Sequence, residues 1–392
     1  MTQQQIPPIV PRFNGYDICI LHDCNLRCRY CSTGFGRWGK QSGLMTFPII
    51  DKVVSFMLEN GNKQFRISFS GGETLLAFDH LQYFIEKTLE LKTNKDIKVL
   101  FELSTNGFYL TKKVAEYLVE KKVSLTFSID GDRATTERNR LSLNGNSVYD
   151  AVKTNLVIYK SALLQNGCSH QRIKAECTID EKANLYDSVI HLFDMGFDDV
   201  IARPAENSRY TGYNKGNSHQ NYLSSLTKLI NHVLQPLDEM DILIGNYKKM
   251  FLNIKQPVIS MITGKSESST CDIMKRRICI LADGRIVPCF LLNSYEDEPL
   301  DFGNVFTGLD NEKVAQFMFQ SMLDIKNLSL RCNGCCYKQF CRICLFELMR
   351  DDHKKAGFME PDFCSFVKKL TAILIQEVSQ KYNIRNGSFF YV

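Results

Sequence analysis

Residues 16–31 have the sequence YDICILHDCNLRCRYC, an apolar run followed at once by three cysteines. The first seven of these residues have the apolar, β-branched composition of a buried strand. In α/β folds, reactive side chains gather at the carboxyl ends of parallel strands. The stretch therefore predicts a strand of such a fold, with the chemistry located in the loop that follows it.

The pattern of this stretch continues along the chain to about residue 204. Apolar runs that predict strands occupy residues 16–22, 65–69, 98–103, 123–129, 172–179 and 198–204. Helices are expected between them, near residues 47–60, 78–92, 111–122, 147–166 and 182–195. Asp79, Thr111 and Asp180 are the expected N-caps of three of these helices. The alternation predicts an α/β fold with a parallel sheet, either an open doubly wound sheet or a partial barrel.

The strand–helix alternation stops after about residue 204, and this change sets the expected domain boundaries. The predicted units are an N-terminal extension (1–15), the six strand–helix units (16–204), a connector (205–264), a cysteine-rich module (265–365) and a C-terminal helix and tail (366–392). The connector is expected to contain a helix near residues 222–237. Apolar residues at helical spacing between 363 and 382 predict a closing helix.

The composition limits the classes of partner. Of the 392 residues, 44% are hydrophobic and 23% are charged, which is ordinary for a globular protein. A net charge of +5 without a long Lys/Arg block indicates neither a nucleic-acid nor a membrane surface. The start of the chain lacks a secretory signal, and no apolar run approaches the ~18 residues of a membrane span. A cytoplasmic location is expected.

The fifteen cysteines are unevenly placed, with nine of them after residue 270. In a reducing compartment, clustered cysteines indicate metal ligands rather than disulfides. Cys24, Cys28 and Cys31 supply three thiolates in one short loop, enough for three irons of a [4Fe–4S] cluster, so that the fourth iron is open. A zinc site is the alternative, although zinc sites usually close at four ligands. Cys19 is expected in the core.

The loop CNLRCRYC resembles the signature of the radical S-adenosylmethionine (SAM) superfamily. The resemblance implies a partial (β/α)6 TIM-like barrel, SAM bound to the open iron, and a 5'-deoxyadenosyl radical after reductive cleavage. Three more strand ends carry the family's motifs in order, SGGE at 70–73, STNG at 104–107 and SIDG at 128–131. The cofactor-binding residues implied in this way are Tyr30, Gly71, Gly72, Glu73, Ser104, Asn106, Ser128, Asp130 and Arg140.

Some of these motifs leave alternatives open. Asn-Gly and Asp-Gly pairs are also ordinary turn signals. The resemblance implies that Glu73 accepts hydrogen bonds from the SAM ammonium group, and the adjacent glycines allow close approach of the backbone. Thr74 stands where the family often has proline, and ATTERNR replaces a usual His-Asp pair. Arg138 therefore competes with Arg140 as the arginine that binds the SAM carboxylate.

The C-terminal cysteines resemble the SPASM extension of radical SAM enzymes that modify peptides. The resemblance implies two auxiliary [4Fe–4S] clusters, hence three clusters in all. The first would be bound by Cys271, Cys289 and Cys344, with Cys279 as the natural fourth ligand, and the second by Cys332, Cys335, Cys341 and Cys364. The spacing between Cys341 and Cys344 is one residue short and Cys336 is left over, so the partition stays open. Zinc ribbons are the alternative. Asp283-Gly284 predicts a hairpin turn within the module.

Most of the chain is thus similar to radical SAM maturases of ribosomal peptides, and residues 31–47 (CSTGFGRWGKQSGLMTF) resemble a stretch of cross-link-forming members. The implied product is a cyclophane-type carbon–carbon or carbon–oxygen cross-link, or a thioether. A fourth ligand at Cys279 would favour the first two. An auxiliary cluster would take up the spare electron, and Glu206 is a candidate base for the proton. Arg203, Tyr210 and Tyr213 are expected to hold the peptide.

Two other functions remain open at this point. An anaerobic sulfatase-maturating enzyme, which makes formylglycine, would use the same clusters. A non-catalytic iron–sulfur or zinc scaffold is the alternative from another class. The implied partners are a precursor peptide and an external one-electron reductant. Because only 23 residues precede Cys24, we expect no leader-binding domain and therefore a separate leader-binding protein or another binding surface.

Overall fold

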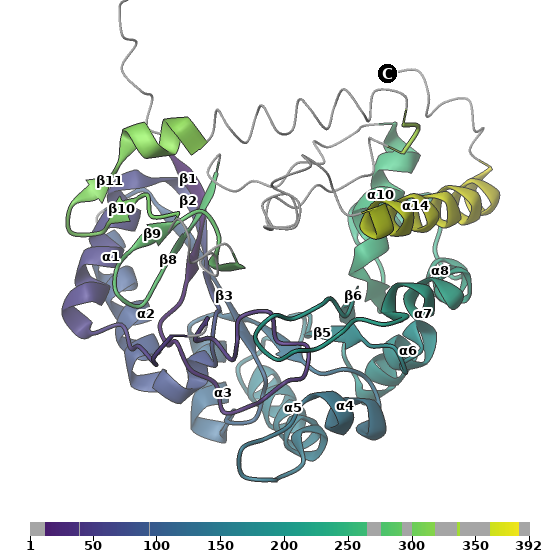
Figure 1. Cartoon of the computed structure of the whole chain (residues 1–392), viewed down its shortest axis with the longest axis horizontal. Coiled ribbons are helices and arrows are strands. Elements are labelled where there is room, and N and C mark those ends of the chain that lie inside the picture. Colours follow the sequence, from purple (N-terminus) through teal and green to yellow (C-terminus); the bar gives the residue numbers. More distant parts are fainter. Residues whose placement is uncertain are drawn as a thin grey trace, which may run out of the picture.

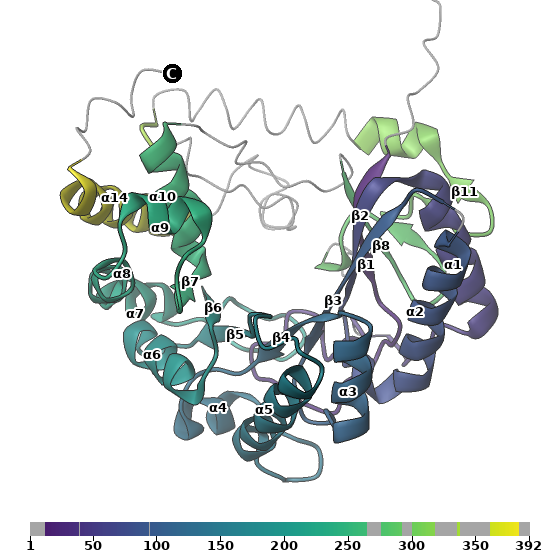
Figure 2. The ribbon, with the colours of Figure 1, turned by 180° about the vertical axis from the view of Figure 1, so that it is seen from behind.

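The computed structural model of the chain describes residues 12–38, 40–93, 95–264, 276–291, 300–317, 335–337 and 361–383. Within these ranges, nine strands form one sheet in the order β7-β6-β5-β4-β3-β2-β1-β8-β9. The sheet is curved, and the helices lie along its outer side (Figure 1). The same arrangement is seen from behind in Figure 2. The expected partial barrel is therefore confirmed.

The six predicted strand–helix units are all present. The strands are β1 (Phe13–Ile18), β2 (Gly61–Phe69), β3 (Lys98–Thr105), β4 (Ser124–Ser128), β5 (Lys174–Ile179) and β6 (Asp199–Pro204). The helices are α1 (Phe47–Asn60), the 3-10 helix η1 (Thr74–Ala77), α2 (Phe78–Lys92), α3 (Lys112–Glu120), α4 (Arg133–Asn139), α5 (Val148–Gln165) and α6 (Leu185–Met195). Strands β1 to β6 pair in parallel, each with the next.

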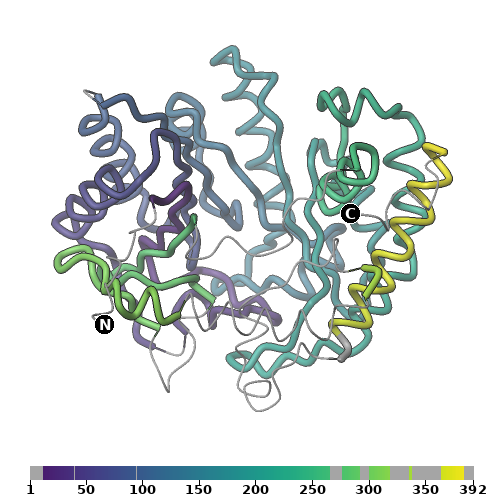
Figure 3. The backbone as a smooth tube through the Cα atoms, turned by 90° about the horizontal axis from the view of Figure 1, so that it is seen from above, coloured from purple at the N-terminus to yellow at the C-terminus, as the bar shows by residue number. Residues whose placement is uncertain are grey.

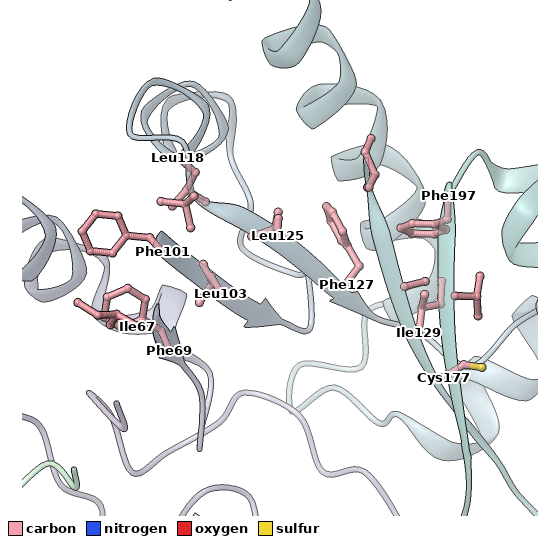
Figure 4. Close-up of a cluster of buried hydrophobic side chains, with 14 of the residues drawn as sticks. Ile67, Phe69, Phe101, Leu103, Leu118, Leu125, Phe127, Ile129, Cys177 and Phe197 are labelled. Atoms are coloured by element: carbon pink, nitrogen blue, oxygen red, sulfur yellow. The ribbon is translucent and has the colours of Figure 1, made fainter. Parts of the chain in front are cut away.

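The hydrophobic core lies between the outer face of the sheet and these helices. Figure 4 shows part of it, with Ile67, Phe69, Phe101, Leu103, Leu125 and Phe127 of β2 to β4 beside Leu118 of α3. The apolar residues on each strand are two positions apart, so they share a face. Burial of this face against the helices is the main source of stability of the barrel.

The inner face of the sheet is polar. Glu102 accepts a hydrogen bond from Ser68 Oγ at 3.2 Å, and its Oε1 lies 3.1 Å from Arg66 Nε. Farther along the sheet, Arg203 Nε lies 3.2 Å from Glu176 Oε1. Charged side chains are stable only where they remain hydrated or are paired with an opposite charge. The inner face therefore differs from the apolar interior of a closed barrel.

Some boundaries differ from the sequence prediction. β1 begins at Phe13, inside the expected N-terminal extension, because Phe13 is fully buried and pairs with Gly61. It ends at Ile18 rather than at residue 22. Helix α4 was not predicted, and the side chain of Asp132 caps it by accepting a hydrogen bond from Thr135 N at 2.8 Å.

One of the three predicted N-caps is confirmed. The side chain of Thr111 accepts a hydrogen bond from the backbone of α3. Asp79 instead lies in the first turn of α2, where a carboxylate still interacts favourably with the helix dipole. Asn184 caps α6 by accepting a hydrogen bond from Asp187 N, and the Asp180 carboxylate instead pairs with Arg138.

The connector adds to the sheet. It contains α7 (Ser218–Ser224), α8 (Leu226–Leu234), α9 (Glu239–Ile244), β7 (Met250–Phe251) and α10 (Leu252–Thr263). The single helix expected near residues 222–237 is thus two helices that meet at Ser225. β7 pairs in parallel with β6 and forms one edge of the sheet.

The C-terminal module contributes the opposite edge. β8 (Arg277–Ile280) pairs in parallel with β1, and β9 (Ile286–Val287) returns antiparallel to β8, with Gly284 at a φ of +82° in the predicted turn. A small pair follows, β10 (Gly303–Asn304) with β11 (Gly308–Leu309). The predicted closing helix is α14 (Pro361–Tyr382), which packs on α8 and α10. Figure 3 shows the green hairpin beside purple β1 and yellow α14 beside the teal connector.

Candidate functional site

The loop after β1 presents the three cysteines of the C-x3-C-x2-C motif. All three side chains are half-buried, and two receive backbone N–H donors: Leu26 N is 3.4 Å from Cys24 Sγ, and Phe35 N is 3.1 Å from Cys31 Sγ. Burial raises the pKa of the Cys24 and Cys28 thiols to about 12. Bound iron would supply the positive charge that their ionisation needs. Thiols with N–H donors directed at sulfur fit a [4Fe–4S] cluster.

Asp23, just before the motif, fixes the shape of this loop. Its Oδ1 accepts hydrogen bonds from Arg37 Nη2 at 2.7 Å and from Cys24 N at 2.8 Å. Burial opposes ionisation of Asp23, but these bonds outweigh it, and the pKa of Asp23 is lowered. The carboxylate therefore ties residue 37 to the first cysteine.

Three glycines allow the cysteine loop to pack on the end of β2. A Cβ on Gly72 would lie 2.1 Å from the carbonyl oxygen of Asp23, and one on Gly36 would lie 2.5 Å from Gly72 Cα. Gly71 has a φ of +107°, and a Cβ there would lie 2.8 Å from Cys19 Sγ. The SGGE motif was expected to let the backbone approach a ligand. Its glycines are required here for contact between protein segments.

Glu73 is buried and joins the ends of β2 and β3. Its Oε1 accepts hydrogen bonds from Thr105 Oγ1 at 2.8 Å and from Leu75 N at 3.1 Å, and its Oε2 accepts one from Asn106 N at 2.7 Å. Desolvation raises the pKa of Glu73, although these bonds oppose the shift. The carboxylate thus positions the backbone of the STNG motif.

Asn106 reaches the cysteine loop. Its Nδ2 donates to Asn25 Oδ1 at 2.7 Å and lies 3.8 Å from Cys24 Sγ. Ser104, on the inner face of β3, is exposed, and Ser128, at the end of β4, is half-buried. The structure therefore brings Asn106 to the predicted cluster site and leaves the two serines along the inner face of the sheet.

Asp130 and Arg140, both buried, form one network with the half-buried Tyr30 of the cysteine loop. Asp130 Oδ1 accepts hydrogen bonds from Arg140 Nη2 and from Thr178 N, both at 2.9 Å, and Oδ2 accepts one from the Tyr30 hydroxyl. The Arg140 guanidinium also lies over the Tyr30 ring, 5.7 Å from its centre. Burial works against the charge of Arg140, but the attraction of Asp130 raises its pKa well above the ordinary value.

The two candidate arginines have different surroundings. Arg138 binds Asp180 through Nε and Nη2, both at 2.8 Å, which uses the flat edge of its guanidinium. Arg140 lies close enough to Cys28 to favour its thiolate, and Arg140 Nε is buried with no hydrogen-bond partner among the described residues. The structure therefore places Arg140, and not Arg138, at the cysteine loop.

The loop after β6 (residues 205–217) is hydrogen-bonded to the cysteine loop, a contact that was not predicted from the sequence. Ser208 Oγ donates to the carbonyl oxygen of Cys31 at 2.6 Å, and the Thr211 hydroxyl donates to that of Arg29. Backbone carbonyls are obligatory acceptors when buried, so these two bonds hold the second half of the motif in place. Contacts between two irregular loops have no periodic sequence signal.

The tyrosines of the same loop add aromatic contacts. A Cβ on Gly34 would lie 2.9 Å from the Tyr210 ring, so the ring packs directly on the glycine. The Tyr213 ring meets Tyr30 edge to face with centres 6.3 Å apart, and its hydroxyl donates to Glu181 Oε2 at 2.6 Å. Tyr210 and Tyr213 were expected to hold a peptide, and in the structure both lie against the cysteine loop.

Glu206, the candidate base, has a histidine partner. His219 Nε2 lies 2.6 Å from Glu206 Oε1, and Lys215 Nζ lies 3.8 Å from Glu206 Oε2. The His219 ring stacks on Phe366 of α14, with ring centres 4.6 Å apart. His219, in α7, was not among the predicted site residues, because an isolated histidine has no signal in the sequence. Arg203 lies on the inner face, paired with Glu176 as described above.

The remaining cysteines are placed as follows. Cys19 is fully buried, as predicted, and its Sγ lies 3.8 Å from the Sγ of Cys279, which is also fully buried. Cys289, Cys335 and Cys364 are half-buried, and Cys336 is exposed. The other predicted ligands lie outside the described residues: Cys271, Cys332, Cys341 and Cys344. No helix in the described part of the chain is long and apolar enough to cross a membrane.

Comparisons of sequence agree with this geometry. Residues 18–164 match the family model of the Radical SAM superfamily. A cysteine-type anaerobic sulfatase-maturating enzyme of Clostridium novyi (strain NT) is 24% identical over 342 residues, 82% of this chain and 84% of that protein. Such an enzyme of Clostridium perfringens (strain ATCC 13124) is 31% identical over 143 residues, but the match spans only 38% of that protein.

Comparisons of structure extend the likeness to nearly the whole chain. A structure described as native anSMEcpe with bound AdoMet aligns with a TM-score of 0.74 and 20% identity, covering 95% of this chain and all of that one. Streptococcus suis SuiB bound to its precursor peptide SuiA aligns with a TM-score of 0.51 and 17% identity, covering 77% of this chain and 64% of that one. At these identities the structural likeness concerns the fold.

Proposed function

We propose a function for this chain from the premise that it is a radical SAM enzyme, with its radical SAM domain at residues 18–164. The proposed reaction oxidises a side chain of a ribosomally made precursor peptide and installs a carbon–carbon, carbon–oxygen or thioether cross-link. When bound, the cluster and SAM supply a 5'-deoxyadenosyl radical that removes a hydrogen atom from the substrate. The observation that carries the proposal is the cysteine loop, which the Asn106 and Ser208 side chains contact at the carboxyl edge of the sheet.

In this proposal Cys24, Cys28 and Cys31 hold the cluster. Asn106 and the amides of Leu26 and Phe35 donate toward two of the sulfurs. Hydrogen bonds to cluster sulfurs and partial burial are the protein's means of setting a reduction potential. The loop therefore has both the ligands and the surrounding donors that a SAM-binding cluster needs.

Glu73 and Arg140 are the residues proposed to bind the ammonium and carboxylate groups of SAM. Among the described residues, Glu73 Oε2 accepts only the Asn106 amide, so a lone pair remains for an ammonium group. Arg140 Nε, which has no hydrogen-bond partner within the described ranges, is a donor suited to a carboxylate. Asp130 holds Arg140 and Tyr30 in position. Gly71, Gly72, Ser104 and Ser128 complete the proposed cradle.

The inner face of the open sheet is the proposed route of the peptide. Its ion pairs, Arg66 with Glu102 and Arg203 with Glu176, provide donors and acceptors for an extended backbone. The SuiB structure, which shares this fold, contains a precursor peptide. A peptide substrate is therefore compatible with both the fold and the polarity of this surface.

Glu206 is the proposed base for the proton that leaves when the substrate radical is oxidised. Its 2.6 Å contact with His219 gives the proton a second group to which it can pass. The predicted auxiliary clusters would accept the electron, and of their predicted ligands Cys289, Cys335 and Cys364 lie in the described part of the chain. An external reductant and a separate leader-binding protein are further parts of the proposal.

Formylglycine formation is the second candidate function. It is favoured by the length of the similarity to the Clostridium novyi sulfatase-maturating enzyme, which spans 82% of this chain. SuiB, by contrast, is covered over only 64% of its chain. The two candidate functions share hydrogen abstraction and loss of one further electron, and they differ in the fate of the oxidised carbon.

The reactivity of the product with an aldehyde probe distinguishes the two functions, because a cross-link and formylglycine made from Ser both lose two hydrogens. The anaerobically reconstituted protein would be incubated with SAM, dithionite and, separately, short peptides encoded beside its gene and a sulfatase peptide with Cys or Ser at the modified position. A cross-link removes two hydrogens from the precursor and leaves no aldehyde, so a hydrazide probe does not react. A hydrazide-reactive product from the sulfatase peptide alone would establish formylglycine formation and overturn the cross-link proposal.

A further inference from the structure

Cys279 lies at the seam between the radical domain and the C-terminal module. Strand β8 pairs in parallel with β1, so that Cys279 stands opposite Asp17, and Cys19 N donates to the carbonyl oxygen of Ile280 at 3.0 Å. Neighbouring residues in a parallel pair point to the same face, and Cys19 is two positions beyond Asp17. The two cysteines therefore meet on the inner side of this seam.

The sulfur of Cys279 is enclosed by protein. It lies 3.8 Å from Cys19 Sγ, and both residues are 0% exposed. Trp38, Leu281 and Val287 complete this small apolar cluster. Apolar side chains packed around a thiol are typical of a structural cysteine.

The backbone covers the Cys19 side of the pair. A Cβ on Gly71 would lie 2.8 Å from Cys19 Sγ, so the SGGE turn contacts Cys19 directly. A cluster ligand needs one side of its sulfur open to an iron atom about 2.3 Å away, a distance typical of metal–thiolate bonds. The enclosure described above does not fit that requirement.

We infer that Cys279 is a core thiol that joins β8 to β1, and that it is not a ligand of an auxiliary cluster. The inference rests on the proposed function for the existence of such a cluster. If Cys279 is not a ligand, the first auxiliary cluster lacks the fourth cysteine that the resemblance implies. The argument that four protein ligands at this cluster disfavour thioether formation then no longer holds. Cys289, at the end of the same hairpin, remains half-buried.

The test is the iron content of single variants after anaerobic reconstitution of the full chain. The variants are Cys279→Ala and Cys279→Val, with Cys19→Ala as the matched control from the same pair and Cys289→Ala as the variant of an assigned ligand. Iron, acid-labile sulfide, absorbance near 400 nm and the electron paramagnetic resonance spectrum of the reduced protein would be recorded. The valine variant fills the space of the cysteine with an apolar side chain, so that a loss of iron in it cannot be attributed to a cavity that destabilises the fold.

The inference predicts that Cys279→Ala, Cys279→Val and Cys19→Ala keep the iron and the spectra of the wild-type protein. The two alanine variants would melt lower by similar amounts, about 2–4 °C. Cys289→Ala would lose one cluster, about four irons per chain. Loss of those irons in both Cys279 variants, with Cys19→Ala intact, would overturn the inference. A wild-type protein with about four irons, unchanged in Cys289→Ala, would contradict the auxiliary clusters of the proposed function instead.

Discussion

Arg138 and Arg140 are two positions apart in the sequence, and the sequence alone could not choose between them. The structure separates them through their acidic partners. Asp180 takes both nitrogens on one edge of Arg138, whereas Asp130 takes one nitrogen of Arg140 and leaves Nε unpartnered among the described residues. Asp180 follows β5 and is 42 positions from Arg138, whereas Asp130 follows β4 and is 10 positions from Arg140. The choice of carboxylate depends on how these strand ends come together in the fold, and no local sequence pattern encodes it.

The two arginines should respond differently to the same substitution. Arg140→Lys is expected to weaken SAM binding about tenfold, because a lysine cannot reproduce the bidentate donor geometry of a guanidinium. Arg138→Lys, the matched control, should change SAM affinity by less than about twofold. Isothermal titration of the reconstituted protein with SAM measures both. Equal losses in the two variants would contradict the assignment of Arg140.

The Arg138–Asp180 pair should also appear in the acid stability of the fold. Burial would raise the pKa of Asp180, but the bonds from Arg138, Asn139 and the Lys182 amide together lower it below the ordinary value. A lowered carboxyl pKa stabilises the fold above the pKa of the unfolded chain, about 3.9, and this contribution disappears as the pH falls through the folded value.

Arg138→Gln tests this linkage. At pH 7 the variant is expected to lose about 1.5–3 kcal/mol of unfolding free energy, the usual range for hydrogen bonds to charged groups. The difference from wild type should narrow as the pH is lowered from 5 to 3. Urea unfolding across that range is the measurement, and a difference that widens with acid would show that the pair has the opposite linkage.

At the scale of elements, local pattern predicted the six strand–helix units well, because each strand and helix has its own hydrophobic period. It predicted neither β7 nor the pairing of β8 with β1. β7 has two residues, too few for a period. The β8–β1 pair joins residues about 260 positions apart, such as Asp17 and Cys279, and depends on the completed barrel edge.

The contact between the cysteine loop and the loop after β6 is also invisible to such patterns, and Gly34 provides a way to test it. Gly34 has a φ of +57°, and a side chain there would lie 2.9 Å from the Tyr210 ring. Gly212, on the loop after β6, has a φ of +69°, and a Cβ built there would have no atom within 4 Å. Both glycines lose backbone freedom on substitution by alanine, but only Gly34→Ala separates the loops.

Gly212→Ala should therefore cost about 1–2 kcal/mol of stability, the penalty for a left-handed alanine, with the cluster unchanged. Gly34→Ala should in addition shift the midpoint potential of the proposed SAM-binding cluster and lower its iron occupancy. Potentiometric titration followed by electron paramagnetic resonance reports the potential. If the two variants have the same potential and iron occupancy, the loop after β6 does not position the cysteine loop.

At the scale of the whole molecule, the sheet is open, and its two faces have different roles. The outer face is apolar and packs on the helices, while the inner face carries ion pairs such as Arg66 with Glu102. One edge is β7 from the connector and the other is the β8–β9 hairpin of the C-terminal module. The module with the later cysteines is thus joined directly to the strand that leads into the cysteine loop.

This arrangement explains how a motif of eight residues predicted so much of the site. CNLRCRYC follows β1, and the parallel sheet brings the ends of β2, β3 and β4 to the same edge, where Glu73, Asn106 and Asp130 lie. What the motif could not indicate is the packing around it, in which Ser208 bonds to the Cys31 carbonyl oxygen and the Tyr210 ring packs on Gly34.

The proposed function depends on a cluster, held by Cys24, Cys28 and Cys31, at which SAM is reductively cleaved. The most direct measurement is the formation of 5'-deoxyadenosine by the anaerobically reconstituted, dithionite-reduced protein supplied with SAM, beside the variant in which these three cysteines are alanine. We expect 5'-deoxyadenosine and methionine in equal amounts from the wild-type protein and none from the variant. An iron-loaded wild-type protein that forms no 5'-deoxyadenosine, or a variant that still forms it, would show that these cysteines do not hold such a cluster.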